Sequence, residues 1–386
     1  MDPRRQLSDA TRVVVKVGTH VVTEGGVRIA LGRVHGIVED IADLVRRGRQ
    51  VLLVSSGSIA LGMRALGLAE RPDSLGLRQA CAAIGQGKLM ELYTRAFEQL
   101  GLVAAQVLLT QEDLADRDRA LCLRTTLFRL LELGVVPILN ENDSVSVREI
   151  MDAQTVGAIE ERSFGDNDGL SARVAVAVDA DALVLLSDVD GLRTADPRTD
   201  PDAERIAVVA PGEEPDASIG DAPSSLGRGG MGKKLAAARI AAHAGVSVVI
   251  ASGERPGELA RILRGEDVGT IVLPAQRRRA RRRYIAVEAP CRGALVVNDG
   301  AVEALGRRKA SLLAVGVVGV EGQFGRGDVV EIRDVHGRIH GRGLSNYTAS
   351  ECRRIAGHHS DEFERLLGYR GYDTVVGRDN LVWEDL

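Results

Sequence analysis

A single lysine lies within an apolar run near the N-terminus. Lys16 is the fourth residue of the run 13–17, Val-Val-Val-Lys-Val, and Gly18 follows this run directly. A short run of β-branched residues is typical of a buried strand, and an unpaired ammonium group buried there costs on the order of several kcal/mol. We therefore expect an anion to meet the Lys16 ammonium. Because Gly18 has no side chain, the backbone can approach that anion closely and direct N–H groups at it.

A second pair of lysines follows a glycine-rich segment much later in the chain. Residues 227–234 read Gly-Arg-Gly-Gly-Met-Gly-Lys-Lys, and a helical pattern starts at Met231. Backbone N–H groups at a helix start, together with a cation, favour phosphate. The segment nearly fits the P-loop pattern, but Lys234 replaces the hydroxyl residue that binds magnesium. It also fits the G-x-G-x-x-G dinucleotide pattern, but residues 223–226 do not form the upstream strand that this pattern requires.

Two cations on glycine-rich turns suit phosphoryl transfer. Charge spreads over the oxygens of the moving group, so catalysis requires mainly positioning and electrostatic stabilisation. Lys16 and Lys234 can supply this from the two ends of a site, and Asp166 can hold both ammonium groups in place. The alternative role for Asp166 is that of a helix N-cap. A carboxylate acceptor, with a usual pKa of about 4.3, is ionised at neutral pH and needs no general base. His20 is then a bystander.

The composition is that of an ordinary globular protein. The chain has 386 residues, of which 45% are apolar and 27% charged, and a net charge of −4. This length favours two domains. No apolar run approaches the roughly 18 residues of a membrane span, and the polar N-terminus lacks a signal-peptide core. The four cysteines lie far apart without a CxxC pair. We therefore expect a cytoplasmic protein with no membrane partner and no metal site of its own.

Apolar runs alternate with helical patterns up to about residue 273. The predicted strands are 13–17, 51–54, 103–109, 135–139, 182–186 and 246–250. The predicted helices are 33–47, 75–100, 119–133, 167–178 and 231–243. Nearly continuous apolar strands separated by helices indicate an α/β fold, in which helices cover both faces of a mainly parallel sheet to give three layers.

Small or polar residues follow four of these strands. The segments are 18–19 (Gly-Thr), 55–58 (Ser-Ser-Gly-Ser), 140–143 (Asn-Glu-Asn-Asp) and 187–191 (Ser-Asp-Val-Asp-Gly). In parallel sheets, ligands bind beyond the carboxyl ends of the strands. Turn chemistry alone explains any one of these loops, but it explains the set of four poorly. We therefore expect a functional site at this edge of the sheet.

The character of the sequence changes near Pro274. We expect a first domain at 1–274, a basic linker at 275–283 that contains the run Arg277–Arg283, and a second domain at 284–386. The second domain is predicted to be small and β-rich, since glycines separate short strand patterns at 284–287, 293–297, 315–320 and 328–333.

Together these segments resemble the amino-acid kinase superfamily. The motifs are Val-Val-Lys-Val-Gly-Thr (14–19), Val-Ser-Ser-Gly (54–57), Asn-Glu-Asn-Asp (140–143), Gly-Asp-Asn-Asp (165–168), Thr-Ala-Asp-Pro (194–197) and the segment 227–234. The tail is similar to a PUA domain, and Arg-Ile-Ala-Gly-His-His-Ser (354–360) resembles a C-terminal signature of the branch that phosphorylates glutamate. The resemblance spans nearly the whole chain and implies the amino-acid kinase fold followed by a PUA domain.

The resemblance also implies an activity and a site. The activity is ATP-dependent phosphorylation of the γ-carboxylate of L-glutamate to L-glutamyl 5-phosphate and ADP, the first step of proline biosynthesis, with Mg²⁺ held mainly by phosphate oxygens and water. The residues that it places at ATP are Lys16, Gly18, Ser187, Asp188, Arg228, Gly229, Gly230, Met231, Gly232, Lys233 and Lys234. The residues that it places at glutamate are Ser56, Asn140, Asp143 and Asn167. An anionic Asp143 suits the α-ammonium group, and Ser56 and Asn167 can donate to carboxylate oxygens.

The same resemblance implies partners. These are proline as a feedback inhibitor, glutamyl phosphate reductase as the enzyme that receives the labile product, and further copies of the chain in a homo-oligomer. Two features depart from the family pattern: Lys233 stands where relatives usually carry threonine, and the loop 148–165 is longer than expected.

Two other functions stay open at this point. A sister kinase would act on aspartate, N-acetylglutamate, carbamate or a nucleotide, and the PUA-like tail argues against it. An RNA-binding protein would use the PUA-like domain and the run Arg277–Arg283 to meet phosphates. Because only 3% of the residues are aromatic, a stacking surface for RNA is hard to build, and a solvated linker is the favoured interpretation of the run.

Overall fold

The computed structural model describes residues 3–24, 28–145, 167–195, 200, 202–213, 230–274, 291–308, 310–369 and 371–383. The chain divides into two compact units, Met1–Asp116 with Cys122–Arg278 and Arg117–Leu121 with Arg279–Leu386. The expected boundary at 274 and the linker 275–283 stay predictions, because residues 275–290 lie outside the described part. In the described part of the chain, every helix is too short or too polar to cross a membrane.

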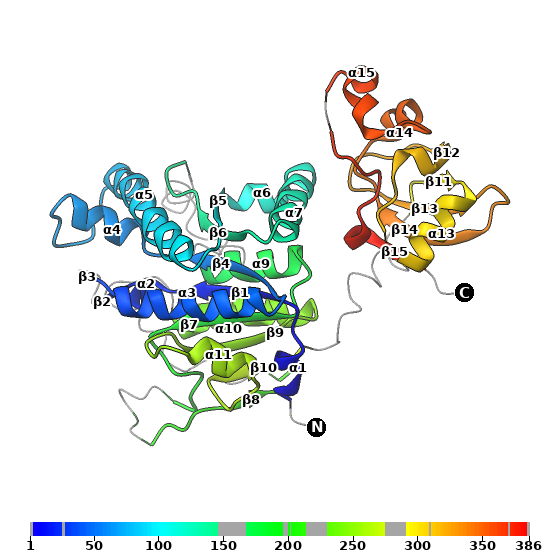
Figure 1. The fold of residues 1–386 in the computed structure, drawn as a ribbon. Coiled ribbons are helices and arrows are strands. Elements are labelled where there is room, and N and C mark those ends of the chain that lie inside the picture. The colour runs from blue at the N-terminus through cyan, green and yellow to red at the C-terminus, as the bar shows by residue number, and fades with distance from the viewer. Residues whose placement is uncertain are drawn as a thin grey trace, which may run out of the picture. The chain divides into compact units, whose positions relative to one another are not determined.

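The larger unit is built on one eight-stranded sheet (Figure 1). Its strands are β1 (Arg12–Val17), β4 (Gln50–Ser55), β5 (Ala104–Leu109), β6 (Val136–Glu141), β7 (Ala182–Ser187), β8 (Val208–Val209), β9 (Ser247–Ser252) and β10 (Thr270–Val272). They lie in the order β5-β6-β4-β1-β7-β9-β10-β8. Only the β9–β10 pair is antiparallel, so the predicted mainly parallel sheet is confirmed.

Helices cover both faces of this sheet. The helices within residues 1–278 are α1 (Arg5–Ser8), α2 (Thr19–Val22), α3 (Leu31–Arg46), α4 (Ser58–Ala65), α5 (Leu75–Gln99), α6 (Gln111–Ala115), α7 (Arg117–Glu132), α9 (Asn167–Ala177), α10 (Met231–His243) and α11 (Glu258–Leu263). The first residues of α7, Arg117–Leu121, group with the smaller unit. A small hairpin of β2 (Thr23–Glu24) and β3 (Arg28–Ile29) follows α2. The six predicted strands and five predicted helices of this unit are all present, with ends displaced by at most two residues.

The alternation of side chains along β1 decides where Lys16 points. Val13, Val15 and Val17 join the core that contains residues of α3, α5 and α11. Val14 joins the other core, with residues of α7, α9 and α10. Because side chains in a strand alternate between faces, Lys16 shares the face of Val14. The strand therefore directs its ammonium group toward the face that α9 and α10 cover.

Helices α4 and α5 approach each other at two glycines. A Cβ atom added to Gly85 of α5 would lie 1.7 Å from the Ser58 carbonyl oxygen of α4, and one added to Gly62 of α4 would lie 1.8 Å from the Cys81 carbonyl oxygen of α5. No other residue type fits at such distances. This contact fixes α4, which is not among the predicted helices; of its eight residues, only Ser58 belongs to the polar segment 55–58 that the sequence analysis singled out.

The smaller unit contains a five-stranded sheet in the order β12-β11-β13-β14-β15. Its strands are β11 (Gly293–Val297), β12 (Val317–Gly322), β13 (Val329–Asp334), β14 (Ile339–Leu344) and β15 (Leu381–Trp383). Its helices are α13 (Asp299–Arg308), α14 (Ala349–Ile355) and α15 (Phe363–Leu367), with single turns of 3₁₀-helix at Ala314–Gly316, Ser360–Glu362 and Arg378–Asn380. In its core the rings of Tyr347 and Phe363 meet edge to face, with centroids 5.8 Å apart.

The predicted strands of this unit need one correction. The strand predicted at 315–320 begins only at Val317, because residues 314–316 form a 3₁₀ turn. The strands predicted at 293–297 and 328–333 are present within one residue, and the segment 284–287 lies outside the described residues. Strand β14 was missed because glycines and an arginine interrupt its apolar pattern. Strand β15 was missed because it has only three residues.

The substitution Gly85→Ala tests the α4–α5 contact. The added methyl group must displace a backbone carbonyl, so we expect the free energy of unfolding to fall by about 3 kcal/mol. Gly87→Ala is the matched control on the same helix, because a Cβ atom there meets nothing within 4 Å. It should stabilise the protein by up to about 1 kcal/mol through helix propensity. Urea unfolding of both variants checks this, and similar effects of the two changes would contradict the packing described.

Candidate active site

One buried carboxylate joins the two lysines singled out from the sequence. The Lys16 Nζ atom lies 2.6 Å from Oδ1 of Asp168, and the Lys234 Nζ atom lies 3.4 Å from Oδ2 of the same residue. Lys16 and Lys234 are each 6% exposed and Asp168 is 1% exposed. The predicted convergence of these two ammonium groups is therefore present in the structure.

The elements of the fold explain this meeting. Lys16 points from β1 to the face that α9 and α10 cover, Asp168 is the second residue of α9, and Lys234 lies in the first turn of α10. Burial alone would raise the pKa of Asp168, but the charges of Lys16 and Lys234 and their hydrogen bonds hold that pKa below its ordinary value. The three groups together carry one net positive charge, which suits an incoming phosphate group.

The carboxylate expected in this role was Asp166. Asp166 lies outside the described residues, so its role stays a prediction, while the contacts expected of it are made by Asp168. The sequence places both aspartates at the start of the same helix. The alternation along β1 indicates which face the helix must cover, but only the helix start at Asn167 decides which carboxylate turns toward the lysines.

Residues at the ends of β1 and β7 lie beside this pair. A Cβ atom added to Gly18 would lie 3.6 Å from the Lys16 Nζ atom, so the glycine keeps space beside the ammonium group. The Gly18 N–H donates to the Leu186 carbonyl oxygen at 3.0 Å, which leaves this N–H with a partner inside the sheet. Of the two roles expected for Gly18, this leaves only one: the missing side chain lets an anion approach the backbone closely beside the Lys16 ammonium group.

Ser187 and Asp188 form the end of β7. The Ser187 hydroxyl donates to Oδ1 of Asp188 at 2.8 Å. Burial acts to raise the pKa of Asp188, but this hydrogen bond, the residue's own backbone N–H and the charges of His20 and Lys234 lower it overall. The expected bystander His20 is thus within electrostatic reach of the site.

The structure describes only part of the glycine-rich segment. Gly230, Met231, Gly232, Lys233 and Lys234 are described, and Arg228 and Gly229 lie outside the described residues. Gly230 precedes α10 with an extended backbone, and its carbonyl oxygen accepts the N–H groups of Lys233 and Lys234. The Lys233 side chain is exposed and that of Lys234 is buried, so the two neighbouring lysines have different surroundings.

A network of amide and hydroxyl groups lies next to the lysine pair. The Asn167 Nδ2 atom donates to Oδ1 of Asn140 at 2.9 Å, to Oγ of Ser56 at 2.9 Å and to the Ser55 carbonyl oxygen at 3.1 Å. Asn140 in turn donates to Oε1 of Gln86 at 2.8 Å. The Oδ1 atom of Asn167 is buried and has no hydrogen-bond partner among the described residues. Three of the four residues predicted at glutamate are thus joined, because Asn167 donates to both Ser56 and Asn140.

The fourth residue, Asp143, lies near the start of α4. Its Oδ2 atom accepts a long hydrogen bond of 3.4 Å from the Ser58 hydroxyl. Two residues of α5 that the sequence analysis missed support this part of the site: Gln86, and Tyr93, whose hydroxyl lies 3.0 Å from the Ser55 hydroxyl. Burial, partly offset by this hydrogen bond, raises the pKa of Tyr93 to about 12. The sequence gives little indication of the roles of Gln86 and Tyr93, since a polar residue on a partly buried helix has many possible partners.

These groups lie at the carboxyl ends of β6, β4, β1 and β7, which are consecutive neighbours in the sheet. The segments that follow these strands therefore lie along one edge of the sheet, as expected. That they form a functional site stays a prediction. Two lysines that share one buried carboxylate, next to an amide network at the edge of a mainly parallel sheet, are the arrangement expected of a phosphotransferase.

Comparison with known proteins agrees with this class. The model of the amino acid kinase family matches residues 11–252, and the PUA domain model matches residues 293–367. The chain belongs to the amino acid kinase family.

Full-length relatives narrow the family further. Glutamate 5-kinase of Moorella thermoacetica is 46% identical over 381 residues, 98% of each chain. Glutamate 5-kinase of Carboxydothermus hydrogenoformans is 46% identical over 99% of this chain and 100% of its own, and that of Myxococcus xanthus is 47% identical over 98% and 97%. The chain is thus a member of the glutamate 5-kinase family, and the resemblance seen in its motifs is confirmed.

Removal of the Asp168 charge should give a stability loss that depends on pH. Because the pKa of Asp168 is below its ordinary value of 3.8 in the folded protein, its carboxylate stabilises the fold above that pH. The stabilisation is lost as the pH falls through the folded-state pKa. We expect Asp168→Asn to lower the free energy of unfolding by about 3 kcal/mol at neutral pH, and this difference to shrink below about pH 4.

Asp190→Asn provides the control, because Asp190 pairs with Arg193 at 2.7 Å at an exposed position. It should cost less than about 1 kcal/mol. Urea unfolding of the wild type, Asp168→Asn and Asp190→Asn at a series of pH values gives the free energies of unfolding to be compared. A cost of Asp168→Asn that stays constant down to pH 3, or that matches the control, would argue against the buried pair.

Proposed function

We propose that this protein transfers the γ-phosphoryl group of ATP to the γ-carboxylate of L-glutamate, giving L-glutamyl 5-phosphate and ADP in the first step of proline biosynthesis. The sharing of the buried Asp168 carboxylate by Lys16 and Lys234 is the observation that carries the proposal. The glutamate 5-kinases that match nearly the whole chain supply the acceptor.

The lysine pair supplies the electrostatic part of the reaction. Negative charge spreads over the oxygens of the moving phosphoryl group. Lys16 and Lys234 donate to these oxygens, and Asp168 keeps the two ammonium groups from repelling each other in a buried place. Their positions are set before the substrates arrive, so little reorganisation is needed at the moment of transfer. The acceptor carboxylate is already ionised, so the site requires no residue to remove a proton from it.

The amide network receives glutamate. Asn167 directs a buried and unpartnered Oδ1 atom into this part of the described site, and it can accept a hydrogen bond from an ammonium group. Asp143 supplies a carboxylate for the same ammonium group, and the Ser56 hydroxyl can donate to a carboxylate oxygen. Asn140 fixes the Asn167 side chain through a 2.9 Å hydrogen bond. The expected result is a glutamate held with its γ-carboxylate toward the lysine pair.

In this proposal the nucleotide binds on the side of Ser187, Asp188 and the start of α10 (Gly230 to Lys234), and Arg228 and Gly229 are expected from the family resemblance to contact its phosphates. Among the described residues, no group of three or more His, Cys, Asp or Glu side chains is placed to hold a metal ion. Mg²⁺ bound to phosphates is held mainly by their oxygens and by water, and this is the role proposed for it here. When bound with ATP, Mg²⁺ neutralises charge on the phosphate chain.

The protein is also proposed to have an inhibitor, a partner enzyme and further copies of itself as partners. Proline as a feedback inhibitor, hand-over of the product to glutamyl phosphate reductase, a homo-oligomeric state and a cytoplasmic location follow from the family resemblance alone. RNA binding has less support, because only 3% of the residues are aromatic and a stacking surface for RNA is hard to build from so few. Loss of activity on addition of proline would support the first of these roles.

The direct test of the reaction measures ADP release with ATP and different acceptors. We compare glutamate with aspartate, N-acetylglutamate, carbamate and UMP. Glutamate should support a rate at least about 100-fold above the others, because a site built to pair polar groups rejects ligands that leave them unpaired. Equal or faster turnover with another acceptor would replace glutamate in this proposal.

Neighbouring lysines give a matched pair for the catalytic role. Lys234→Ala should lower kcat by about 100-fold, as for the loss of a donor to the transition state. Lys233→Ala removes the same group from an exposed position one residue away and should cost much less. Lys16→Ala should resemble Lys234→Ala. Steady-state kinetics of the three variants give the values of kcat. If the kcat of Lys234→Ala were close to that of the wild type, Lys234 would have no catalytic role.

Gln86 is a positioning residue in this scheme, because it acts through Asn140. Gln86→Ala should raise KM for glutamate about fivefold through the loss of one hydrogen bond, with kcat and KM for ATP nearly unchanged. Gln86→Glu keeps the acceptor atom and should restore most of the affinity. If both variants changed kcat and both KM values alike, the effect would be on folding and not on the amide network.

A further inference from the structure

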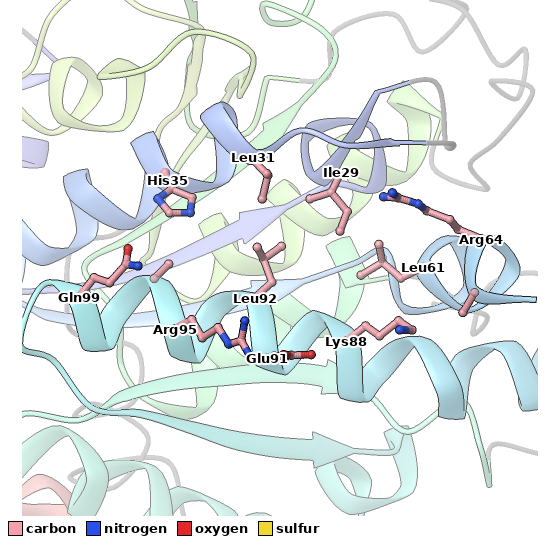
Figure 2. Close-up of a pocket in the computed structure, with 12 residues that line it drawn as sticks. Ile29, Leu31, His35, Leu61, Arg64, Lys88, Glu91, Leu92, Arg95 and Gln99 are labelled. Atoms are coloured by element: carbon pink, nitrogen blue, oxygen red, sulfur yellow. Dashed lines mark ion pairs between the residues drawn. The ribbon is translucent and has the colours of Figure 1, made fainter.

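A cavity of about 500 Å³ lies between α3, α4 and α5, apart from the residues of the candidate active site (Figure 2). The residues that line it are Ile29, Leu31, His35, Leu61, Arg64, Ala65, Lys88, Glu91, Leu92, Arg95, Ala96 and Gln99. Its size falls within the range of about 300–1,000 Å³ that is usual for small-molecule sites. The residues assigned above to ATP and glutamate do not line it.

The lining has an apolar middle and a cationic end. Ile29, Leu31, Leu61 and Leu92 face the middle of the cavity (Figure 2). Leu61 is 2% exposed, whereas Leu31 is 54% exposed and leaves apolar surface open to a ligand. An apolar wall of this kind favours a ligand with an apolar body.

The charges at the cavity do not balance. Arg95 pairs with Glu91 at 2.7 Å, whereas Arg64 and Lys88 have no ion pair or hydrogen bond within the described residues. Both come from the α4 end of the cavity, Arg64 from α4 and Lys88 from the facing part of α5 (Figure 2). Two unpaired cations beside an apolar wall are complementary to an anionic group on an apolar body.

The walls of this cavity are the helices that support the glutamate side of the active site. Helix α5 contacts that side through the Gln86–Asn140 and Tyr93–Ser55 hydrogen bonds, and α4 begins at Ser58, which donates to Asp143. The close contact at Gly85 and Gly62 joins the two helices. A ligand that shifts α4 against α5 therefore also shifts the groups that hold Asn167.

We propose that this cavity is an effector site for a small amphipathic anion, with one carboxylate, sulfonate or phosphate group on an apolar body. The anionic group binds Arg64 and Lys88, and the apolar body covers Leu31, Leu61 and Leu92. Occupation of the site changes the affinity for glutamate, and this second part rests on the proposed function.

The probe for the site is 8-anilinonaphthalene-1-sulfonate, whose fluorescence rises in apolar surroundings. We expect it to bind the wild-type chain at one site, and the double variant Arg64→Gln/Lys88→Gln to bind it about tenfold more weakly. N-phenyl-1-naphthylamine has the same body without the sulfonate, and its affinity should not change. Arg129→Gln removes an exposed cation from α7 on the other face of the sheet and should leave the affinity for both probes unaltered.

Several results would overturn the site. These are no saturable binding of the sulfonate, equal binding by the wild type and the double variant, or equal losses for the charged and the neutral probe. A change in the oligomeric mass of the double variant in sedimentation would show instead that a second copy of the chain covers the cavity.

The linkage is tested by titrating the sulfonate with and without saturating glutamate. Two ligands that influence each other must do so reciprocally, so glutamate should shift the affinity for the probe at least about twofold. An unchanged affinity, in a protein that phosphorylates glutamate, would overturn the effector role. A protein that releases no ADP with glutamate would instead fail the proposed function, and the comparison of the two naphthalene probes would still decide on the cavity.

Discussion

Two buried ammonium groups share one carboxylate, and the rest of the site depends on this arrangement. Without Asp168, Lys16 and Lys234 would repel each other in surroundings where water cannot screen them. With it, the three groups leave a single positive charge that is fixed in place, because each comes from a different element of the larger unit. The order of strands in the sheet matters for this reason, since it brings the end of β1 under the starts of α9 and α10.

Helix α9 connects the two halves of the site through consecutive residues. Asn167 joins the amide network, and Asp168 holds the lysines. A phosphate group and an acceptor carboxylate that bind to these two halves are therefore placed next to each other by one turn of one helix. In the proposed reaction this placement accounts for most of what the protein must do, because phosphoryl transfer depends mainly on positioning and charge.

Much of this arrangement was predictable from the sequence. The strands were evident from apolar runs, and the edge of the sheet from the polar residues that follow them. The cost of burying a cation singled out Lys16, and the glycine-rich segment at a helix start singled out Lys234. Asp168 was not distinguished from Asp166, because both precede the same helical pattern and a difference of two residues depends on where the helix starts. Gln86 and Tyr93 could not be assigned, since their partners Asn140 and Ser55 are far away in the sequence. The glycine contact of α4 with α5 also requires coordinates, because a glycine inside a helix has no distinctive pattern.

The central claim is that both ammonium groups act on the phosphoryl group in transfer. A crystal structure of the protein with ADP, glutamate and aluminium fluoride, which imitates the moving phosphoryl group, tests it most directly. The account predicts that the Nζ atoms of Lys16 and Lys234 both lie within about 3 Å of the fluoride ligands, with Asp168 still between them. A complex in which either lysine points away from the fluoride group would contradict the account.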